Sequence, residues 1–123
     1  MTTLIPAHLV EALHDSALNH GELPGRAQDK SLESALARVE NHLVYGMIED
    51  AYYLAALYAE VIARGHCFND GNKRTAFETM NFCLHLNGIA IAWPDTEVAD
   101  RIIALARGDS DANTLADWLR AQG

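Results

Sequence analysis

Between residues 66 and 74 the chain reads HCFNDGNKR, a short stretch that holds side chains of several chemical kinds. The imidazole of His66 can accept a proton near neutral pH, and the carboxylate of Asp70 can hold a metal ion. Lys73 and Arg74 can neutralise phosphate oxygens, and an arginine can bind two of them at once. A base, a metal ligand and phosphate donors are what phosphoryl or nucleotidyl transfer requires. This stretch is therefore the candidate site.

The backbone around Gly71 predicts a further contribution to the same site. Glycine permits conformations that other residues resist, so consecutive N–H groups can converge on one anion. A helical pattern begins near Asn72, and the first turn of a helix offers unsatisfied N–H groups and the positive end of its dipole. Together these features predict a phosphate-binding helix N-terminus.

Each residue of this stretch also has a purely structural interpretation. Asp70 alone would most simply cap the following helix, and Asn72 would be a cap or turn residue. His66 would be a structural histidine, and the two cations a solvated helix start. Phe68 is interpreted as a core anchor that holds the loop. For the other residues, their joint spacing favours the catalytic interpretation.

Composition and charge narrow the class of protein. The chain has 123 residues, half of them apolar, which predicts one soluble domain over residues 1–123. The net charge of −8 argues against direct nucleic-acid binding, which needs a basic surface. Against that acidity, Arg64, Lys73 and Arg74 form an expected positive cluster, which suits a small anionic ligand. No apolar run approaches the roughly 20 residues of a membrane span.

The N-terminal residues and the cysteines favour a cytoplasmic protein. The N-terminus has no basic region followed by a long apolar core, so we expect no secretory signal. Cys67 and Cys83 are expected to be reduced thiols, although one disulfide is conceivable. Zinc binding by these cysteines and His66 is disfavoured because there is no paired C-x-x-C spacing.

The helical period of 3.6 residues recurs along the chain, and strand signals are nearly absent. We expect helices that open at Pro6 and after the N-cap Ser31, and a largely apolar central helix over residues 49–64. A helix over residues 72–87 follows the candidate site, and two more follow a segment that is expected to be extended before Pro94. The chain is thus predicted to be a compact all-α bundle of about six helices. Residues expected to face the core include Leu9, Leu13, Ala17, Leu32, Leu36, Val39, Leu43, Leu54, Leu57, Met80, Leu84, Val98, Ile102, Leu105, Leu115, Trp118 and Leu119.

Residues 66–77 resemble the signature of the Fic/Doc superfamily, H-P-F-x-D/E-G-N-G-R-x-x-R, and in particular its Doc (death-on-curing) toxin branch. Cys67 replaces the proline, Lys73 the second glycine and Phe77 the last arginine. Lysine at that glycine, in the string NKRT, is typical of the Doc branch. Residues 23–26, 32–36, 55–59 and 62–66 also resemble Doc-type proteins, so the resemblance covers essentially the whole chain.

The resemblance implies a Fic/Doc-type helical fold and the toxin of a toxin–antitoxin pair. Doc toxins are protein kinases that move the γ-phosphate of ATP to a threonine of elongation factor Tu and so arrest translation. The implied cofactors are ATP and Mg²⁺. The implied partners are elongation factor Tu as substrate and a small Phd-like antitoxin whose C-terminal segment binds the toxin.

The resemblance also implies a role for each matching residue. His66 would be the base that deprotonates the acceptor hydroxyl, and Asp70 would hold Mg²⁺. Lys73 and Arg74 would take part in catalysis as well as in binding. The residues that would bind the phosphates are Gly71, Asn72, Lys73 and Arg74.

Two other functions remain open. One is a Fic-type AMP transferase. The bulk of Lys73 and the loss of the last arginine at Phe77 argue against it, because both remove features of the tight phosphate loop of that enzyme. The other is a non-catalytic module that binds a partner, and it predicts that His66 and Asp70 are dispensable.

Overall fold

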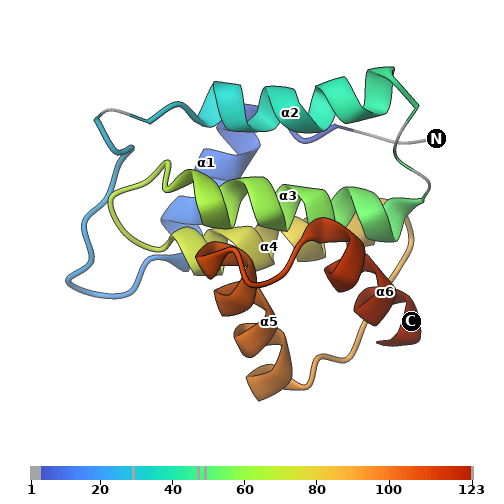
Figure 1. Cartoon of the computed structure of the whole chain (residues 1–123). Helices are drawn as coiled ribbons and strands as arrows, with labels where there is room; N and C mark the ends of the chain where they lie inside the picture. Colours follow the sequence, from blue (N-terminus) through green and yellow to red (C-terminus); the bar gives the residue numbers. More distant parts are fainter. Residues whose placement is uncertain (1–3, 29, 47, 49, 123) are drawn as a thin grey trace.

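The computed structural model describes residues 4–28, 30–46, 48 and 50–122, and within them the chain is all-helical without a strand. This confirms the predicted all-α bundle of about six helices (Figure 1). The helices are α1 (Ala7–Ala17), α2 (Leu32–Val44), α3 (Ala51–Gly65), α4 (Asn72–Leu86), α5 (Asp95–Arg107) and α6 (Ala112–Gln122).

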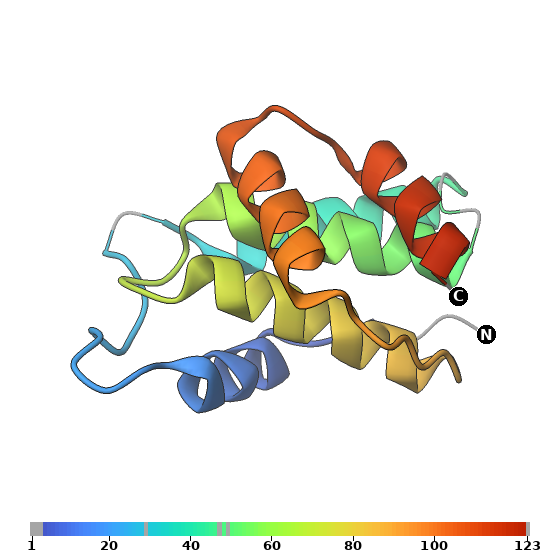
Figure 2. The same cartoon turned by 90° about the horizontal axis from the view of Figure 1, so that it is seen from below.

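Helix α3 is the centre of the bundle. Every residue from 54 to 63 is buried, as expected for a helix that is apolar nearly all round. It packs against α4, α2, α5 and α6, while α1 packs mainly against α4 (Figures 1 and 2). The one acidic residue in this run, Glu60, accepts a hydrogen bond from the N–H of Ala112 at 2.8 Å and so satisfies a free donor where α6 begins.

The predicted ends of the helices lie within one or two residues of the observed ends. The hydroxyl of Ser31 caps α2 by accepting the N–H of Ser34 at 3.1 Å. Helix α3 starts at residue 51 behind the cap Asp50, and the predicted first residue, Glu49, lies outside the described residues. Helix α5 begins at Asp95, and Pro94 holds its cap position.

The predicted core is confirmed in most helices and differs in α1. Leu9, Leu13 and Ala17 are only half-buried, whereas Val10 and His14 are almost completely buried. The inner face of α1 is therefore turned from the face expected from apolar residues alone. His14 can lie inside because the loop before α4 supplies its polar partner, which the sequence pattern does not reveal.

The remaining expectations concern thiols and membranes. Cys67 and Cys83 are buried free thiols in the structure. Burial raises the pKa of the Cys83 thiol to about 12. No helix in the described part of the chain is long and apolar enough to cross a membrane.

Candidate active site

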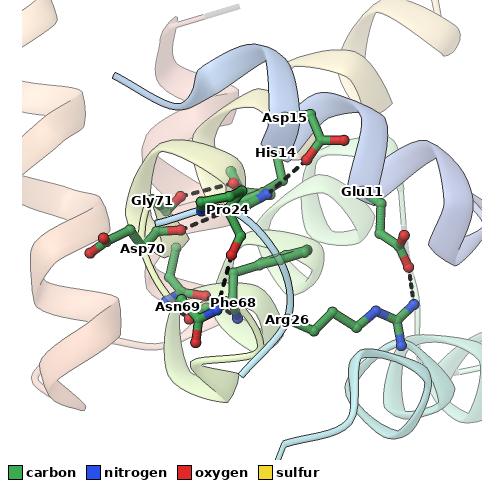
Figure 3. A network of polar contacts seen from close by, with 11 residues as sticks. Glu11, His14, Asp15, Pro24, Arg26, Phe68, Asn69, Asp70 and Gly71 are labelled. Atoms are coloured by element: carbon green, nitrogen blue, oxygen red, sulfur yellow. Dashed lines mark hydrogen bonds and ion pairs between the residues drawn. The ribbon is translucent and has the colours of Figure 1, made fainter. Parts of the chain in front are cut away.

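The motif loop, residues 66–71, joins α3 to α4 and lies at the same end of the bundle as the α1–α2 loop, residues 18–31 (Figures 1 and 2). Hydrogen bonds from the motif loop to backbone carbonyls of the α1–α2 loop join the two loops. The N–H of Asn69 donates to Gly25 O at 3.1 Å, and the side-chain amide of Asn69 donates to Pro24 O at 3.0 Å (Figure 3). The α1–α2 loop therefore forms one wall of the candidate site.

The α1–α2 loop is itself anchored by Arg26. Its backbone forms an isolated antiparallel bridge with Phe68, and its guanidinium pairs with Glu11 of α1 and Glu33 of α2 (Figure 3 draws the contact with Glu11). These hydrogen bonds raise the pKa of Arg26 and lower that of Glu33. One side chain thus ties the motif loop to the first two helices.

Asn72 closes the motif loop from within. Its Oδ1 accepts the N–H of Phe68 at 3.1 Å, and its Nδ2 donates to Phe68 O at 2.9 Å. Phe68 is 3% exposed, which confirms the interpretation as a core anchor. Both polar atoms of the Asn72 side chain are thus engaged by Phe68, while its backbone N–H forms no hydrogen bond within the described residues.

His14 of α1 holds the same loop and was given no role by sequence reasoning. Its Nε2 lies 2.7 Å from the backbone oxygen of Asp70, and its ring stacks on that of Phe68 at 3.9 Å (Figure 3). The side chain is 1% exposed. No signal in the sequence distinguishes this histidine from the others, because its partners lie about 56 residues away.

Asp70 does not cap α4. Its Oδ2 accepts the N–H of Leu23 in the α1–α2 loop at 2.8 Å, and the cap position of α4 belongs to Gly71. Within the described residues Oδ1 has no hydrogen-bond partner. The simplest structural interpretation of Asp70 is therefore wrong, and one carboxylate oxygen remains available at the start of the helix.

Gly71 adopts the left-handed conformation, with φ 76°. A Cβ at this position would lie 3.3 Å from Leu18 Cδ2 and 3.7 Å from His14 Cδ2, so both the conformation and the space favour glycine. In the described part of the chain, no backbone hydrogen bond uses the N–H groups of residues 71–74. The predicted free donors at the start of α4 are present.

His66 is the C-cap of α3 and has φ 48° and ψ 42°. Among the described residues it is the only non-glycine residue with positive φ. Its side chain is exposed and forms no hydrogen bond within the described chain. A bulky residue in this conformation is unusual, and such positions are frequent at functional sites.

The two cations of the first turn of α4 differ in their surroundings. Lys73 is exposed and has no ion pair within the described residues, whereas Arg74 is held on both sides. Its Nε donates to Ala17 O at 3.1 Å, and its Nη2 pairs with the carboxylate of Glu22. Glu22 also accepts the N–H of Asn19 at 2.6 Å. These contacts, first that with Asn19 and then that with Arg74, lower the pKa of Glu22.

Arg64 does not join this cluster, contrary to the expectation from sequence. Its Nε donates to Leu105 O at 2.9 Å, and its guanidinium also contacts Ser110 O and Glu60. The last carbonyls of a helix need partners, and Arg64 supplies one for Leu105 in the last turn of α5. The local positive charge near the motif loop therefore comes from Lys73 and Arg74.

A hollow of about 640 Å³ lies beside these two cations, between the start of α4 and α5. Its walls are mainly apolar and include Phe77, Val98 and Ile102, while Lys73 and Arg74 lie at its polar part. His66 and Asp70 do not line it. The two cations thus separate the motif loop from an apolar hollow.

Residues 4–84 match the model of the Fic/DOC family. The chain belongs to the Fic/DOC family. It is 36% identical over 121 residues to the protein named "Protein kinase doc" of Escherichia phage P1, covering 98% of this chain and 94% of that protein. It is also 36% identical over 91 residues to "Toxin Doc" of Mycolicibacterium smegmatis, covering 69% of this chain and 68% of that protein. These matches confirm the resemblance inferred from residues 66–77.

This Fic/DOC domain has one carboxylate suited to a metal ion at the motif loop. Within the described residues no group of three or more histidine, cysteine or acidic side chains converges on one point. Mg²⁺ is commonly held by one or two carboxylates together with substrate phosphates. The available Oδ1 of Asp70, next to free N–H donors for phosphate, fits such a shared site.

Proposed function

We propose that this chain is a Doc-type toxin and a protein kinase of the cytoplasm. In this proposal it transfers the γ-phosphate of ATP to a threonine hydroxyl of elongation factor Tu and so arrests translation. The observation that carries the proposal is the arrangement at the motif loop. There the exposed imidazole of His66, an available oxygen of Asp70 and the unbonded N–H groups of α4 belong to one continuous segment. The names of the two relatives support it.

The phosphates of ATP would be bound at the start of α4. The N–H groups of residues 71–74 are free donors there, and the helix dipole favours an anion at this end. Asn72 contributes its N–H, since its side chain is bound to Phe68. Lys73 adds a point charge, and Arg74 adds a planar group that can bind two oxygens. Mg²⁺ shared between Asp70 and the phosphates would neutralise the charge of the transferred group.

His66 would act on the acceptor side of the reaction. Its imidazole takes the proton of the threonine hydroxyl while the hydroxyl oxygen forms a bond to the γ-phosphorus. The bond between the γ-phosphorus and the bridging oxygen breaks, and ADP leaves with its charge held at the start of α4. The exposed position of His66 supports this role, because a protein substrate must reach the base.

Two residues support the kinase over the alternative, an AMP transferase. Lys73 stands where the Fic signature has its second glycine and occupies the first turn of α4. Phe77, at the position of the last arginine, packs edge-on against Trp93 with ring centroids 5.6 Å apart. An apolar ring in that place binds no phosphate oxygen.

The antitoxin is proposed to be a Phd-like protein whose C-terminal segment covers the apolar hollow. A segment with apolar side chains would bury the half-exposed Phe77 and Ile103, and its chain would lie over Arg74. Binding there would block the phosphate donors. A charged substitution, Ile103→Asp, is expected to weaken the complex while leaving His66 and Asp70 untouched, as titration calorimetry with the antitoxin peptide would measure.

Intact-protein mass spectrometry of elongation factor Tu tests the proposal. The factor is incubated with this protein, ATP and Mg²⁺, in parallel with the His66→Ala variant. A gain of about 80 Da that is absent with the variant supports phosphate transfer with His66 as base, whereas about 329 Da indicates an AMP transferase. No gain with the folded wild-type protein contradicts elongation factor Tu as the substrate.

A cellular assay separates catalysis from simple binding. Expression of the wild-type protein is expected to stop growth, and His66→Ala is expected to be harmless at the same protein level. If a variant with alanine at both His66 and Asp70 still stops growth, the non-catalytic module is the better description.

A further inference from the structure

His14 is a buried polar side chain that the proposed mechanism does not use. It is 1% exposed and lies against Phe68, Asp70 and Gly71 of the motif loop. Its ring stacks on Phe68, its Nε2 binds the Asp70 carbonyl, and its Cδ2 faces the position where Gly71 lacks a Cβ. The hydrogen bond to the Asp70 carbonyl is short, at 2.7 Å.

The chemistry of this contact determines where the proton lies on the ring. A carbonyl oxygen only accepts hydrogen bonds, so Nε2 of His14 must carry the proton. The other ring nitrogen, Nδ1, lies 3.4 Å from the carboxylate of Asp15, which is largely exposed. The useful donor of this side chain is therefore Nε2–H.

Holding the Asp70 carbonyl also sets the direction of the next N–H group. The peptide that carries this oxygen ends at the nitrogen of Gly71, and no described peptide bond is cis. In a planar trans peptide the C=O and N–H bonds point in opposite directions. With the oxygen held toward His14, the N–H of Gly71 points away from α1 and forms no hydrogen bond within the described chain.

The Asp70–Gly71 peptide needs a side chain to hold its orientation because it is followed by glycine. Gly71 lies in the left-handed region and can rotate its peptide more freely than any other residue. The flanking anchor, Asn72 bound to Phe68, holds the ends of the loop but makes no contact with the Asp70–Gly71 peptide. In the described structure the side chain that holds this peptide oxygen is His14.

We propose that His14 is a positioning residue for phosphoryl transfer: its Nε2–H holds the Asp70–Gly71 peptide so that the Gly71 N–H is aimed at the transferred phosphate. This inference rests on the proposed function, in which the start of α4 binds the phosphates. It adds a residue of α1, outside the motif, to the machinery of the site.

Two substitutions separate the donor of His14 from its ring. His14→Phe keeps an aromatic ring against Phe68 and removes the donor. His14→Gln removes the ring and keeps an N–H donor near the position of Nε2. Thr79→Val is the matched control, because Thr79 is also fully buried on the inner side of α4 and its hydroxyl has no partner within the described residues.

The variants are compared by the affinity for MgATP, by kcat and KM for phosphate transfer, and by the amide resonances of residues 70–74. His14→Phe is expected to keep a helical, cooperative fold. It should bind MgATP about tenfold more weakly, lower kcat roughly ten- to hundredfold, and shift the Gly71 amide resonance. His14→Gln should stay within about threefold of wild type, and Thr79→Val should match wild type.

Three results would overturn the inference. A folded His14→Phe protein with wild-type affinity and kcat would show that the donor is not needed. A His14→Gln protein as impaired as His14→Phe would assign the effect to the ring. If His14→Phe does not fold, the wild-type protein still decides, because nitrogen NMR that places the ring proton on Nδ1 alone excludes the bond to Asp70.

The result also separates this inference from the proposed function. A wild-type protein that transfers no phosphate contradicts the proposed function. The affinity for MgATP and the Gly71 amide resonance still report whether His14 controls this peptide.

Discussion

Glu22 is paired with Arg74, the arginine that the proposed mechanism assigns to the phosphates. The two residues lie 52 positions apart and come from the α1–α2 loop and from α4. Hydrogen bonds from the N–H of Asn19 and from Arg74 lower the pKa of Glu22, so its carboxylate is charged at neutral pH. In this structure a carboxylate holds the guanidinium that a phosphate would use, so Glu22 and the nucleotide compete for Arg74.

Replacing Glu22 by glutamine is therefore expected to strengthen MgATP binding severalfold. The guanidinium keeps its hydrogen bond to Ala17 O, which holds it near the start of α4. Titration calorimetry at low salt measures the change. Asp109→Asn is the charge control, because it removes one negative charge from an exposed side chain that has no contact with Arg74 or His14 within the described residues. Equal strengthening by both variants would attribute the effect to net charge.

Replacing His66 by glycine is expected to separate stability from activity. The left-handed conformation at φ 48° costs a residue with a Cβ energy that glycine avoids. The free energy of unfolding should rise by about 0.5–1 kcal/mol, while phosphate transfer falls by about 10²–10⁴. Urea unfolding and a transfer assay measure the two effects. His66→Ala should lose the same activity without the gain in stability; a destabilised glycine variant would contradict the backbone argument.

Replacing Asn72 by alanine is expected to loosen the motif loop. The N–H and C=O of the buried Phe68 both lose their partner, which should cost about 1–3 kcal/mol of the free energy of unfolding. Asn69→Ala is a matched control in the same loop, because Asn69 is exposed and its side chain makes one hydrogen bond, to Pro24 O. Chemical denaturation compares the two, and an equal cost would mean that Asn72 does not close the loop.

Stability is expected to fall in alkaline solution. Burial raises the pKa of Cys83 from 9.0 to about 12, and burial likewise raises that of Tyr58 from 10.0 to about 12. Above pH 9 the unfolded chain begins to lose these protons while the folded protein keeps them, so ionisation favours the unfolded state. The free energy of unfolding should be level below about pH 9 and decline as the pH rises toward 12.

Urea titrations at several pH values test this decline. In a Cys83→Ala variant the decline should be shallower, because the remaining contributions come from Tyr58 and from Cys67, whose pKa burial also raises. A stability that does not change between pH 8 and 11 would contradict the effect of burial on both groups.

Local features of the sequence predicted the helices and the candidate site. The period of the apolar residues reports which residues face a core, and Ser31, Gly65 and Gly71 mark where helices begin and end. The chemistry of residues 66–74 is also local, because a base, a carboxylate and cations within one loop need no distant partner to be noticed. The family match over residues 4–84 agrees with the predicted fold class.

The wrong expectations share one cause. Arg64 was placed with the phosphate-binding cations because it precedes the motif, yet its partners are Leu105 O in the last turn of α5 and Ser110 O after it. The buried face of α1 was assigned to leucines because a buried histidine needs a partner that the helix itself does not contain. In both cases the deciding contact is with a residue more than about 40 positions away.

The all-α class, the position of the motif loop and the kinds of chemistry available in it follow from the sequence alone, since these depend on neighbours along the chain. How each group is held depends on the folded structure. There the Asp70 carboxylate accepts the N–H of Leu23, and Arg74 pairs with Glu22. The backbone carbonyl of Asp70 accepts a hydrogen bond from His14. Hydrogen bonds and ion pairs act over a few ångströms, so which groups they join depends on how the helices and loops pack.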